Sequence, residues 1–390
     1  MEDRNEQLRP SVNSGETAAV EMQTEQQTEA QTEVQVEQQI ETQTNSQVET
    51  QTETRSERPS KRVRIKRWQL LRWREGREVA DLRDTDFVAV GKRAFAGQVR
   101  LEEVRFPASL SAIKTAAFAD CARLRTVVID RQNAVGLAAD AFRDCARLRT
   151  VEGSEMLSVI GKNAFTGCKN LRSVTFGRDL RRIGDGAFEG CVNLERLSIP
   201  SCTEAIGTGA FSGCTELAAL DLEEGLTVLG EGMFRGCAAL AVPSFPESLR
   251  ELPRDSFRDC SAFDVLSLPG SVRSVGASAF RGCVRLTEVK AELGLTAIGA
   301  FSFAGCRDLE TVALPHSLKK LGFGAFGLGF SRRRVRVLAD NEYMLKRLRR
   351  LLLRCGSLGR VTVELGGETL AERRRARHSR SLDDTPTHIS

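Results

Sequence analysis

One arrangement of apolar and polar positions repeats along most of the chain. A phenylalanine returns every 23 residues, with a single step of 24, at Phe95, Phe118, Phe142, Phe165, Phe188, Phe211, Phe234, Phe257, Phe280, Phe303 and Phe326. Cysteine follows nine of these phenylalanines after three residues, at Cys121, Cys145, Cys168, Cys191, Cys214, Cys237, Cys260, Cys283 and Cys306. The consensus unit reads L-x-x-I-G-x-x-A-F-x-x-C-x-x-L-x-x-V-x-L-P-x-x. Eleven units of nearly constant length indicate a solenoid of stacked repeats.

Each repeat contains a strand signal and a turn signal. The alternating stretch, such as residues 171–176, has the period of two that is typical of a β-strand. Because one unit cannot bury its own apolar side chains, successive units are expected to stack with parallel strands about 4.8 Å apart. The A-F-x-x-C segment is expected to form one or two short helical turns on the opposite side, and the preceding glycine to allow the bend that begins them. This predicts an α/β repeat solenoid with one parallel β-sheet face, whose coils are filled by phenylalanine.

The unit resembles the repeat of the BspA-like leucine-rich repeat family. The resemblance covers residues 87–330 and depends most on the A-F-x-x-C-x-x-L spacing, whereas the asparagine column of the better-known leucine-rich consensus is missing. It implies a right-handed solenoid, a binding role that includes surface adhesion in some members, and no enzyme activity. Pro243 occupies a strand position, so we expect a weaker strand in its coil.

Composition divides the chain into five parts. The N-terminal tail (1–60) contains a four-residue unit rich in Gln, Thr and Glu, and residues 1–54 carry a net charge of −10. Large apolar residues are too few there to offset the entropy of ordering, which predicts disorder. The tail is followed by a basic segment and N-terminal cap (61–86), the repeats (87–330), a C-terminal cap (331–367) and a basic disordered tail (368–390).

Basic charge gathers at the two ends of the repeat region. Residues 55–77 carry a net charge of +8 and residues 331–380 a net charge of +10, whereas residues 78–330 carry −1. The segment KRVRIKR is a candidate nuclear-import or nucleic-acid patch. Its basic side chains are Lys61, Arg62, Arg64, Lys66 and Arg67. The residues after it, with both tryptophans, are expected to cap the solenoid.

The C-terminal part shows a strand, a helix and a strand. Residues 334–338 and 361–365 have strand patterns, and Asp340 and Asn341 offer N-cap oxygens to the helix between them. The helix has one apolar face, formed by Met344, Leu345, Leu348, Leu351, Leu352 and Cys355. We interpret this part as a cap over the open end of the solenoid, with a partner-binding or membrane-surface helix as the alternative.

Cysteine and histidine are the residues with potential for chemistry. Equivalent thiols on stacked coils point in parallel and cannot all pair, and neither a CxxC motif nor a histidine cluster offers zinc ligands. We therefore interpret the cysteine column as buried thiols that pack as small apolar groups. His316 lies alone in a loop between coils, so no base is placed beside a nucleophile. The sequence predicts no enzyme activity, no metal and no cofactor.

Outward-facing strand positions form the candidate partner face. Side chains between the buried strand positions project from the sheet. The candidates are Arg105, Thr126, Thr150, Ser173, Thr175, Arg196, Ser198, Asp221, Ser244, Ser267, Lys290 and Thr311. Because they are small and mostly uncharged, we expect a protein or peptide ligand and not a nucleic-acid backbone along this face. No aromatic hot spot stands out.

These features favour a non-enzymatic protein-protein interaction module or scaffold. Two alternatives stay open: a nuclear or nucleic-acid-associated protein that uses residues 61–67 and 372–380, and a surface adhesin-like antigen. The sequence shows neither a secretory signal nor the roughly 18–20 consecutive apolar residues that a membrane helix needs. We therefore expect a cytoplasmic location, with the nucleus as the alternative, and cysteines that stay reduced.

Overall fold

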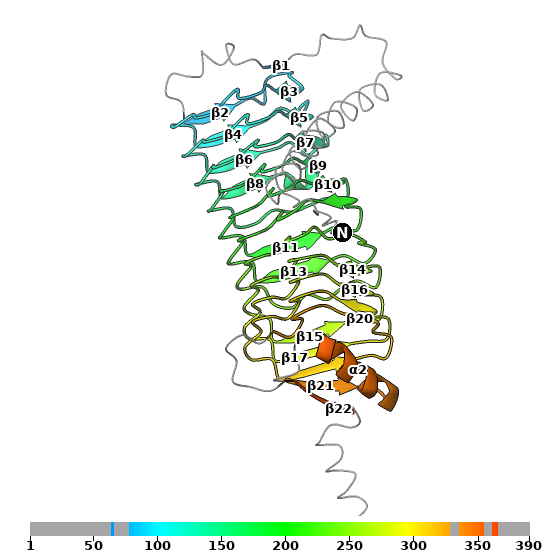
Figure 1. Cartoon of the computed structure of the whole chain (residues 1–390). Helices are drawn as coiled ribbons and strands as arrows, with labels where there is room; N and C mark the ends of the chain where they lie inside the picture. Colours follow the sequence, from blue (N-terminus) through cyan, green and yellow to red (C-terminus); the bar gives the residue numbers. More distant parts are fainter. Residues whose placement is uncertain (1–63, 66–77, 328–334, 355–360, 366–390) are drawn as a thin grey trace, which may run out of the picture. The chain divides into compact units, whose positions relative to one another are not determined.

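The computed structural model in Figure 1 describes residues 64–65, 78–327, 335–354 and 361–365. By internal contacts the chain divides into residues 1–58 and residues 59–390, and everything described belongs to the second unit. The two predicted tails, 1–60 and 368–390, lie outside the described residues.

The alternating stretch of the repeat forms parallel strands along one side of the solenoid (Figure 1). This long-strand series comprises β2 (Val79–Asp81), β4 (Glu103–Arg105), β6 (Thr126–Val128), β8 (Thr150–Glu152), β11 (Arg196–Ile199), β13 (Ala219–Leu222), β15 (Val265–Leu268), β17 (Glu288–Ala291), β19 (Thr311–Leu314), β21 (Val335–Ala339) and β22 (Val361–Leu365). Equivalent positions pair, so Thr126 lies opposite both Glu103 and Thr150. The central residues of β4 and β6, Val104 and Val127, are fully buried. The predicted parallel-strand solenoid is therefore confirmed.

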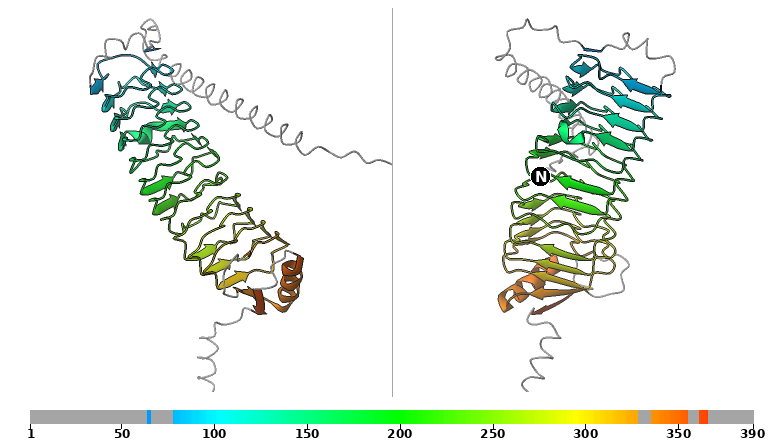
Figure 2. Two further views of the ribbon diagram at one scale, coloured as in Figure 1. Left: turned by 60° about the vertical axis from the view of Figure 1, so that its left-hand side comes forward. Right: turned by 180° about the vertical axis from the view of Figure 1, so that it is seen from behind.

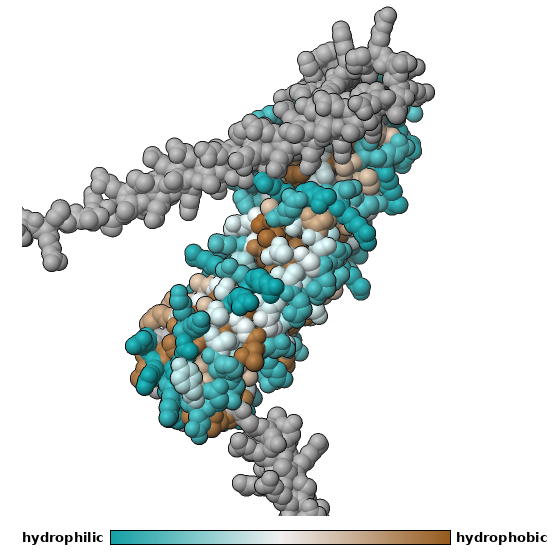
Figure 3. Space-filling model, turned by 90° about the vertical axis from the view of Figure 1, so that its right-hand side faces the viewer, coloured by the Kyte–Doolittle hydropathy of each residue, from teal (hydrophilic) through white to brown (hydrophobic). Residues whose placement is uncertain are grey.

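A second series of parallel strands runs along another side of the coil. This short-strand series comprises β1 (Arg64–Ile65), β3 (Ala89–Val90), β5 (Ala112–Ile113), β7 (Val135–Leu137), β9 (Leu157–Ile160), β10 (Arg182–Ile183), β12 (Ala205–Ile206), β14 (Glu251–Leu252), β16 (Ser274–Val275), β18 (Ala297–Ile298) and β20 (Lys320–Leu321). Figure 2 shows both series from two further directions. In Figure 3 the short-strand side carries pale and brown residues among hydrophilic ones. The sequence predicted one sheet face, because two-residue strands are too short to show a period.

The A-F-x-x-C segment forms a wall of hydrogen-bonded turns, so the predicted short helical turns are wrong. The Cys121 N–H donates to Phe118 O within the coil (3.4 Å), whereas the Phe118 N–H donates to Ala141 O of the next coil (2.8 Å). Positive φ occurs two residues before and two residues after the phenylalanine, as at Ala116 (+52°) and Asp120 (+61°). A helix needs the same φ and ψ at every residue, so these positions prevent one. Within the described residues, helix is confined to the 3₁₀ turn η2 (Ser154–Met156) and α2 (Glu342–Arg354).

The glycine that follows the apolar residue is required by the close approach of neighbouring coils. A Cβ atom at Gly184 would lie 2.5 Å from Lys162 N, and one at Gly276 would lie 2.5 Å from Arg254 N. Neither glycine has a positive φ. The expected reason for this glycine, a bend that only glycine allows, is therefore wrong.

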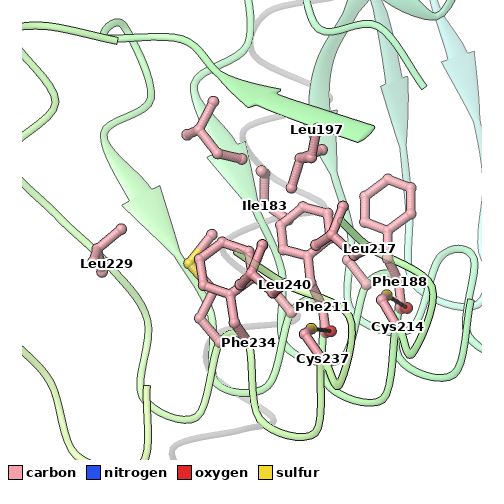
Figure 4. Packing of buried hydrophobic residues seen from close by; sticks show 14 of the residues in the cluster. Ile183, Phe188, Leu197, Phe211, Cys214, Leu217, Leu229, Phe234, Cys237 and Leu240 are labelled. Atoms are coloured by element: carbon pink, nitrogen blue, oxygen red, sulfur yellow. Dashed lines mark hydrogen bonds between the residues drawn. The ribbon is translucent and has the colours of Figure 1, made fainter. Parts of the chain in front are cut away.

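The interior holds one continuous apolar core along the stack. Its centre is a column of phenylalanine rings that stack from Phe95 to Phe326, with centroids 4.7–5.8 Å apart and planes within 19° of parallel. Figure 4 shows this packing around Phe188, Phe211 and Phe234. Each ring covers the faces of its neighbours, which one isolated repeat could not do.

The repeat containing Phe234 interrupts both strand series. No strand forms at residues 242–245, where buried Pro243 has no amide hydrogen to donate. No short strand forms at residues 228–229, between β12 and β14. The weaker strand predicted from Pro243 is confirmed.

The helix α2 packs against the last strands, β20, β21 and β22. Its buried residues are Met344, Leu348 and Leu352. Asn341 Oδ1 accepts a hydrogen bond from the Met344 N–H (2.8 Å), which confirms Asn341 as an N-cap. The strand, helix and strand expected between residues 334 and 365 are all present.

Candidate interaction surface

The cysteine column forms a ladder of hydrogen bonds in the core. Each Sγ donates to the carbonyl oxygen of the column phenylalanine one coil earlier, over 3.1–3.3 Å. Figure 4 shows two examples, from Cys214 to Phe188 O and from Cys237 to Phe211 O. All nine thiols are buried, as the predicted apolar packing requires. Their hydrogen bonds add a polar contact that the sequence did not indicate.

Burial makes these thiols poor nucleophiles and poor metal ligands. Desolvation raises the pKa of the Cys237 and Cys306 thiols to about 12. The thiolate is the reactive and metal-binding form, so the column is unsuited to either chemistry at neutral pH. The described residues contain no group of three or more His, Cys, Asp or Glu side chains arranged to hold a metal ion.

His316 is paired, although the sequence analysis considered it alone. Its Nδ1 lies 2.5 Å from Asp340 Oδ2, which also accepts a hydrogen bond from the His316 N–H. The neighbouring hydroxyl, Ser317 Oγ, donates to Leu295 O. The pair therefore joins a loop to the end of β21, and the nearby serine is bonded elsewhere. The repeat period did not indicate this pair, because the step between these coils is 25 residues, with Thr311 opposite Arg336.

The twelve candidate face residues all point outward and are exposed or half-buried. Pairing places them in two rows that run across the strands: Thr126 lies beside Thr150 in one row, and Ser267 lies beside Lys290 in the other. An isolated bridge between Ser173 and Arg196 continues the first row where no strand forms. The geometry expected for the face is present, and its binding role stays a prediction.

Several charged residues on this face lie beside neighbours of opposite charge. Arg105 lies 2.5 Å from Glu103 and 3.8 Å from Asp81. The Arg83 guanidinium, 2.7 Å from the Asp81 carboxylate, lowers the pKa of that carboxyl to about 2. Lys290 lies 3.2 Å from Glu288. Arg105 and Lys290 are therefore paired, whereas no described residue forms an ion pair with Arg196 or Asp221 of the same face.

The candidate basic patch has five basic residues, and only Arg64 among them is described. The other four lie outside the described residues. Arg64 belongs to β1, which pairs with β3 through Arg64 opposite Ala89. The backbone at Arg64 is therefore part of the short-strand series.

Two exposed phenylalanines near the C-terminal end escaped the sequence analysis. Phe301 and Phe323 are 40% and 64% exposed, and their rings meet edge to face at 5.6 Å. Phe301 has a φ of +56°, at a repeat position where other coils have Asn163 or Asp255. A bulky residue is rare in this conformation. The signal was the extra phenylalanine two residues before Phe303.

Comparison with known proteins identifies the family. The family model described as the BspA type leucine rich repeat region matches in six copies, over residues 83–158, 136–264 and 253–333. No curated protein matches the sequence. No helix in the described part of the chain is long and apolar enough to cross a membrane.

Several solved structures are similar. A leucine-rich repeat protein from Bacteroides ovatus is 21% identical, with a TM-score of 0.51, and the match covers 74% of this chain and 84% of that one. A leucine-rich repeat protein from T. pallidum is 33% identical over 46% of this chain and 81% of its own, with a TM-score of 0.39. A leucine-rich cell surface protein from Faecalibacterium prausnitzii is 19% identical over 77% of this chain and 90% of its own, with a TM-score of 0.41. The likeness to the Bacteroides ovatus protein shows a shared fold. Because the family model spans more than half of the 390 residues, this chain belongs to the BspA-type leucine-rich repeat family.

Proposed function

We propose that this protein is a non-enzymatic interaction module that binds a protein or peptide on the outward face of the long-strand series. The observation that carries the proposal is where the repeats differ from one another. Inward positions such as Val127 and Leu266 are apolar in coil after coil, whereas the two outward rows change among Thr, Ser, Arg, Lys, Asp, Glu, Val and Ala. A surface whose side chains vary on a rigid, repeated backbone suits the recognition of a specific partner.

The chemistry of the described residues favours binding over catalysis. The column thiols are buried, and the His316–Asp340 pair lies beside a serine that donates elsewhere. A nucleic-acid role finds no support on the sheet face, where Arg105 and Lys290 are paired with glutamates and long runs of Lys or Arg are missing.

We also propose that the protein works in a reducing compartment, the cytoplasm or the nucleus. Nine column cysteines donate hydrogen bonds as thiols, and oxidation would remove those donors. Fractionation of the source cells tests this, and recovery of the protein at the cell surface would contradict it.

A matched pair of variants tests the sheet face. Thr175 projects from the face, whereas Thr227, also an exposed threonine, lies on the short-strand side. The full chain, Thr175→Arg and Thr227→Arg are each used to recover proteins from an extract of the source cells, which are then quantified by mass spectrometry. A partner bound by the face is lost at least about tenfold with Thr175→Arg and retained with Thr227→Arg. Equal recovery of every partner by both variants would exclude this face.

A further inference from the structure

A cluster of exposed arginines lies beside the sheet face in the N-terminal half of the solenoid. Two successive repeats contain the same seven residues, CARLRTV, at 121–127 and 145–151. The leucines in these segments, Leu124 and Leu148, are fully buried, so the arginines on either side of each leucine project into solvent. The next repeat adds an exposed arginine at the position that follows its own buried leucine. We name this cluster the arginine ridge: Arg123, Arg125, Arg147, Arg149 and Arg172.

Three arginines of the ridge stack directly above one another. The Arg149 N–H donates to Arg125 O (2.9 Å), and the Arg172 N–H donates to Arg149 O (3.5 Å). Their side chains therefore leave adjacent coils only about 4.8 Å apart. Arg123 and Arg147 form a second column beside the first, two residues earlier in each coil. Like charges placed opposite each other in neighbouring strands repel.

Few acidic side chains offset this repulsion. Arg125 lies 3.6 Å from Glu102, but no described carboxylate lies within 4.0 Å of the other four ridge arginines. By contrast Arg143, on the turn wall, lies within 4 Å of Asp120, Asp140 and Asp144. The ridge is therefore a place where the folded chain gathers positive charge and leaves most of it unpaired.

We propose that the arginine ridge binds a short, carboxylate-rich segment of a partner protein. Guanidinium groups hold carboxylates through two parallel N–H···O bonds, which gives geometric specificity as well as charge attraction. A run of Glu or Asp side chains lying across the three coils would neutralise the stacked arginines. This proposal does not depend on partner binding at the sheet face, since the ridge can be occupied while that face is free.

The boundaries of the ridge favour an acidic peptide over a nucleic acid. Glu102 precedes Arg125 in the column, and Glu195 follows Arg172, as the hydrogen bonds from Arg125 N–H to Glu102 O and from Glu195 N–H to Arg172 O show. A longer phosphate backbone would meet these glutamates beyond three coils. Single-stranded nucleic acids also stack their bases on aromatic side chains. In the described part of the chain, the exposed aromatic residues Phe301, Phe323 and Tyr343 lie in later coils and in α2, outside the ridge.

A binding measurement with the full chain tests the proposal. The probe is a fluorescein-labelled peptide with a run of glutamates between glycine and serine. Its binding is measured by fluorescence polarisation at low and at physiological salt. Arg149→Glu with Arg172→Glu is expected to weaken binding at least about tenfold. The matched control is Arg250→Glu with Arg273→Glu, an exposed pair on the short-strand side that is stacked in the same way, with the Arg273 N–H donating to Arg250 O (2.8 Å). It makes the same change in net charge and is expected to alter binding less than about twofold.

Several outcomes would overturn the proposal. Equal losses in the two double variants would show general attraction to a basic protein, and equal binding of a glutamine version of the peptide would show that carboxylates are not recognised. Binding of single-stranded RNA or duplex DNA that is lost with the ridge variant, without binding of the peptide, would assign the ridge to phosphates.

Arg149→Gln with Arg172→Gln replaces Arg149→Glu with Arg172→Glu if the charge-reversed protein does not fold. Retention of the peptide by Thr175→Arg separates this test from that of the sheet face.

Discussion

At the scale of single residues, each column thiol fills space in the core and also donates a hydrogen bond. Burial of small groups at a fixed spacing was predictable from the sequence. The hydrogen bond was not, because its acceptor is a backbone carbonyl one coil away, 26 residues earlier for Cys121 and 27 for Cys145. Only the stacking of coils brings that carbonyl to the thiol.

The raised thiol pKa makes stability depend on pH above neutrality. Burial raises the pKa of Cys237 from 9.0 to about 12. Between these values the unfolded chain loses this proton while the folded chain keeps it, so the free energy of unfolding falls as pH rises. The loss reaches about 1 kcal/mol per thiol at pH 10. In urea unfolding, the advantage of the natural protein over Cys237→Ala should therefore shrink between pH 8 and pH 10. A constant difference across this range would contradict the expectation.

Phe301 is held in a backbone conformation that suits asparagine better. Its φ of +56° matches that of Asn163 at the equivalent position, +54°. Relief of this strain, about 1–3 kcal/mol, should outweigh the ring contact with Phe323, about 1 kcal/mol. Thermal unfolding should therefore show Phe301→Asn to be more stable by about 1 kcal/mol. Phe323→Asn removes the same ring contact without relieving strain and should be no more stable than the natural protein.

The candidate site was predictable in outline because strand alternation fixes which side chains face outward. The twelve face positions lie where the period of two placed them, for example Thr126 and Ser198. The contact of His316 with Asp340 was not predictable, because the 25-residue step from Thr311 to Arg336 departs from the regular repeat. The stacking of Arg125, Arg149 and Arg172 follows from the repeat, but the lack of acidic neighbours around most of the ridge depends on contacts between coils that the sequence does not show.

At the scale of elements, the long strands were predictable and the turn wall was not. The strands show their period over several residues, as in Arg196–Ile199, where buried and exposed positions alternate. The A-F-x-x-C segment has local i to i+3 hydrogen bonds that favour a helical interpretation. Its other amides bond to the next coil, as Phe118 does to Ala141 O, and one repeat alone holds no information about that partner.

The repeated glycine before the turn wall is expected to tolerate no side chain. A Cβ at Gly184 would lie 2.5 Å from Lys162 N and 2.7 Å from Gly161 C, and backbone atoms cannot move aside cheaply. Gly184→Ala should therefore lower the free energy of unfolding by at least about 3 kcal/mol. Gly190→Ala is the control, because its φ is +69° but no atom lies within 4 Å of the added Cβ, and it should cost only about 1–2 kcal/mol. Equal losses in urea unfolding would rule out coil approach as the cause.

At the scale of the whole repeat array, stability depends on contacts between neighbouring coils. The repeat containing Phe234 is the point where these contacts are weakest. Both strand series are interrupted there, and the distance from Phe211 to Phe234, 5.8 Å between ring centroids, is the longest in the described column. The ring stack still passes through this repeat, so the core stays continuous while the two sheets do not. Local opening should therefore begin near this repeat.

Replacing Pro243 should join the sheets on its two sides. The equivalent inward residues in the flanking coils are Leu220 and Leu266, and Pro243 itself is buried, so Pro243→Val keeps an apolar side chain and restores the missing amide hydrogen. Hydrogen exchange followed by mass spectrometry should show slower exchange in β13 and β15, and the free energy of unfolding should rise by about 1 kcal/mol. Because coupling passes only between neighbouring coils, protection in β4 should hardly change. A uniform gain along the array would mean that the natural protein already opens as one cooperative unit, and that the repeat of Phe234 is no weaker than the others.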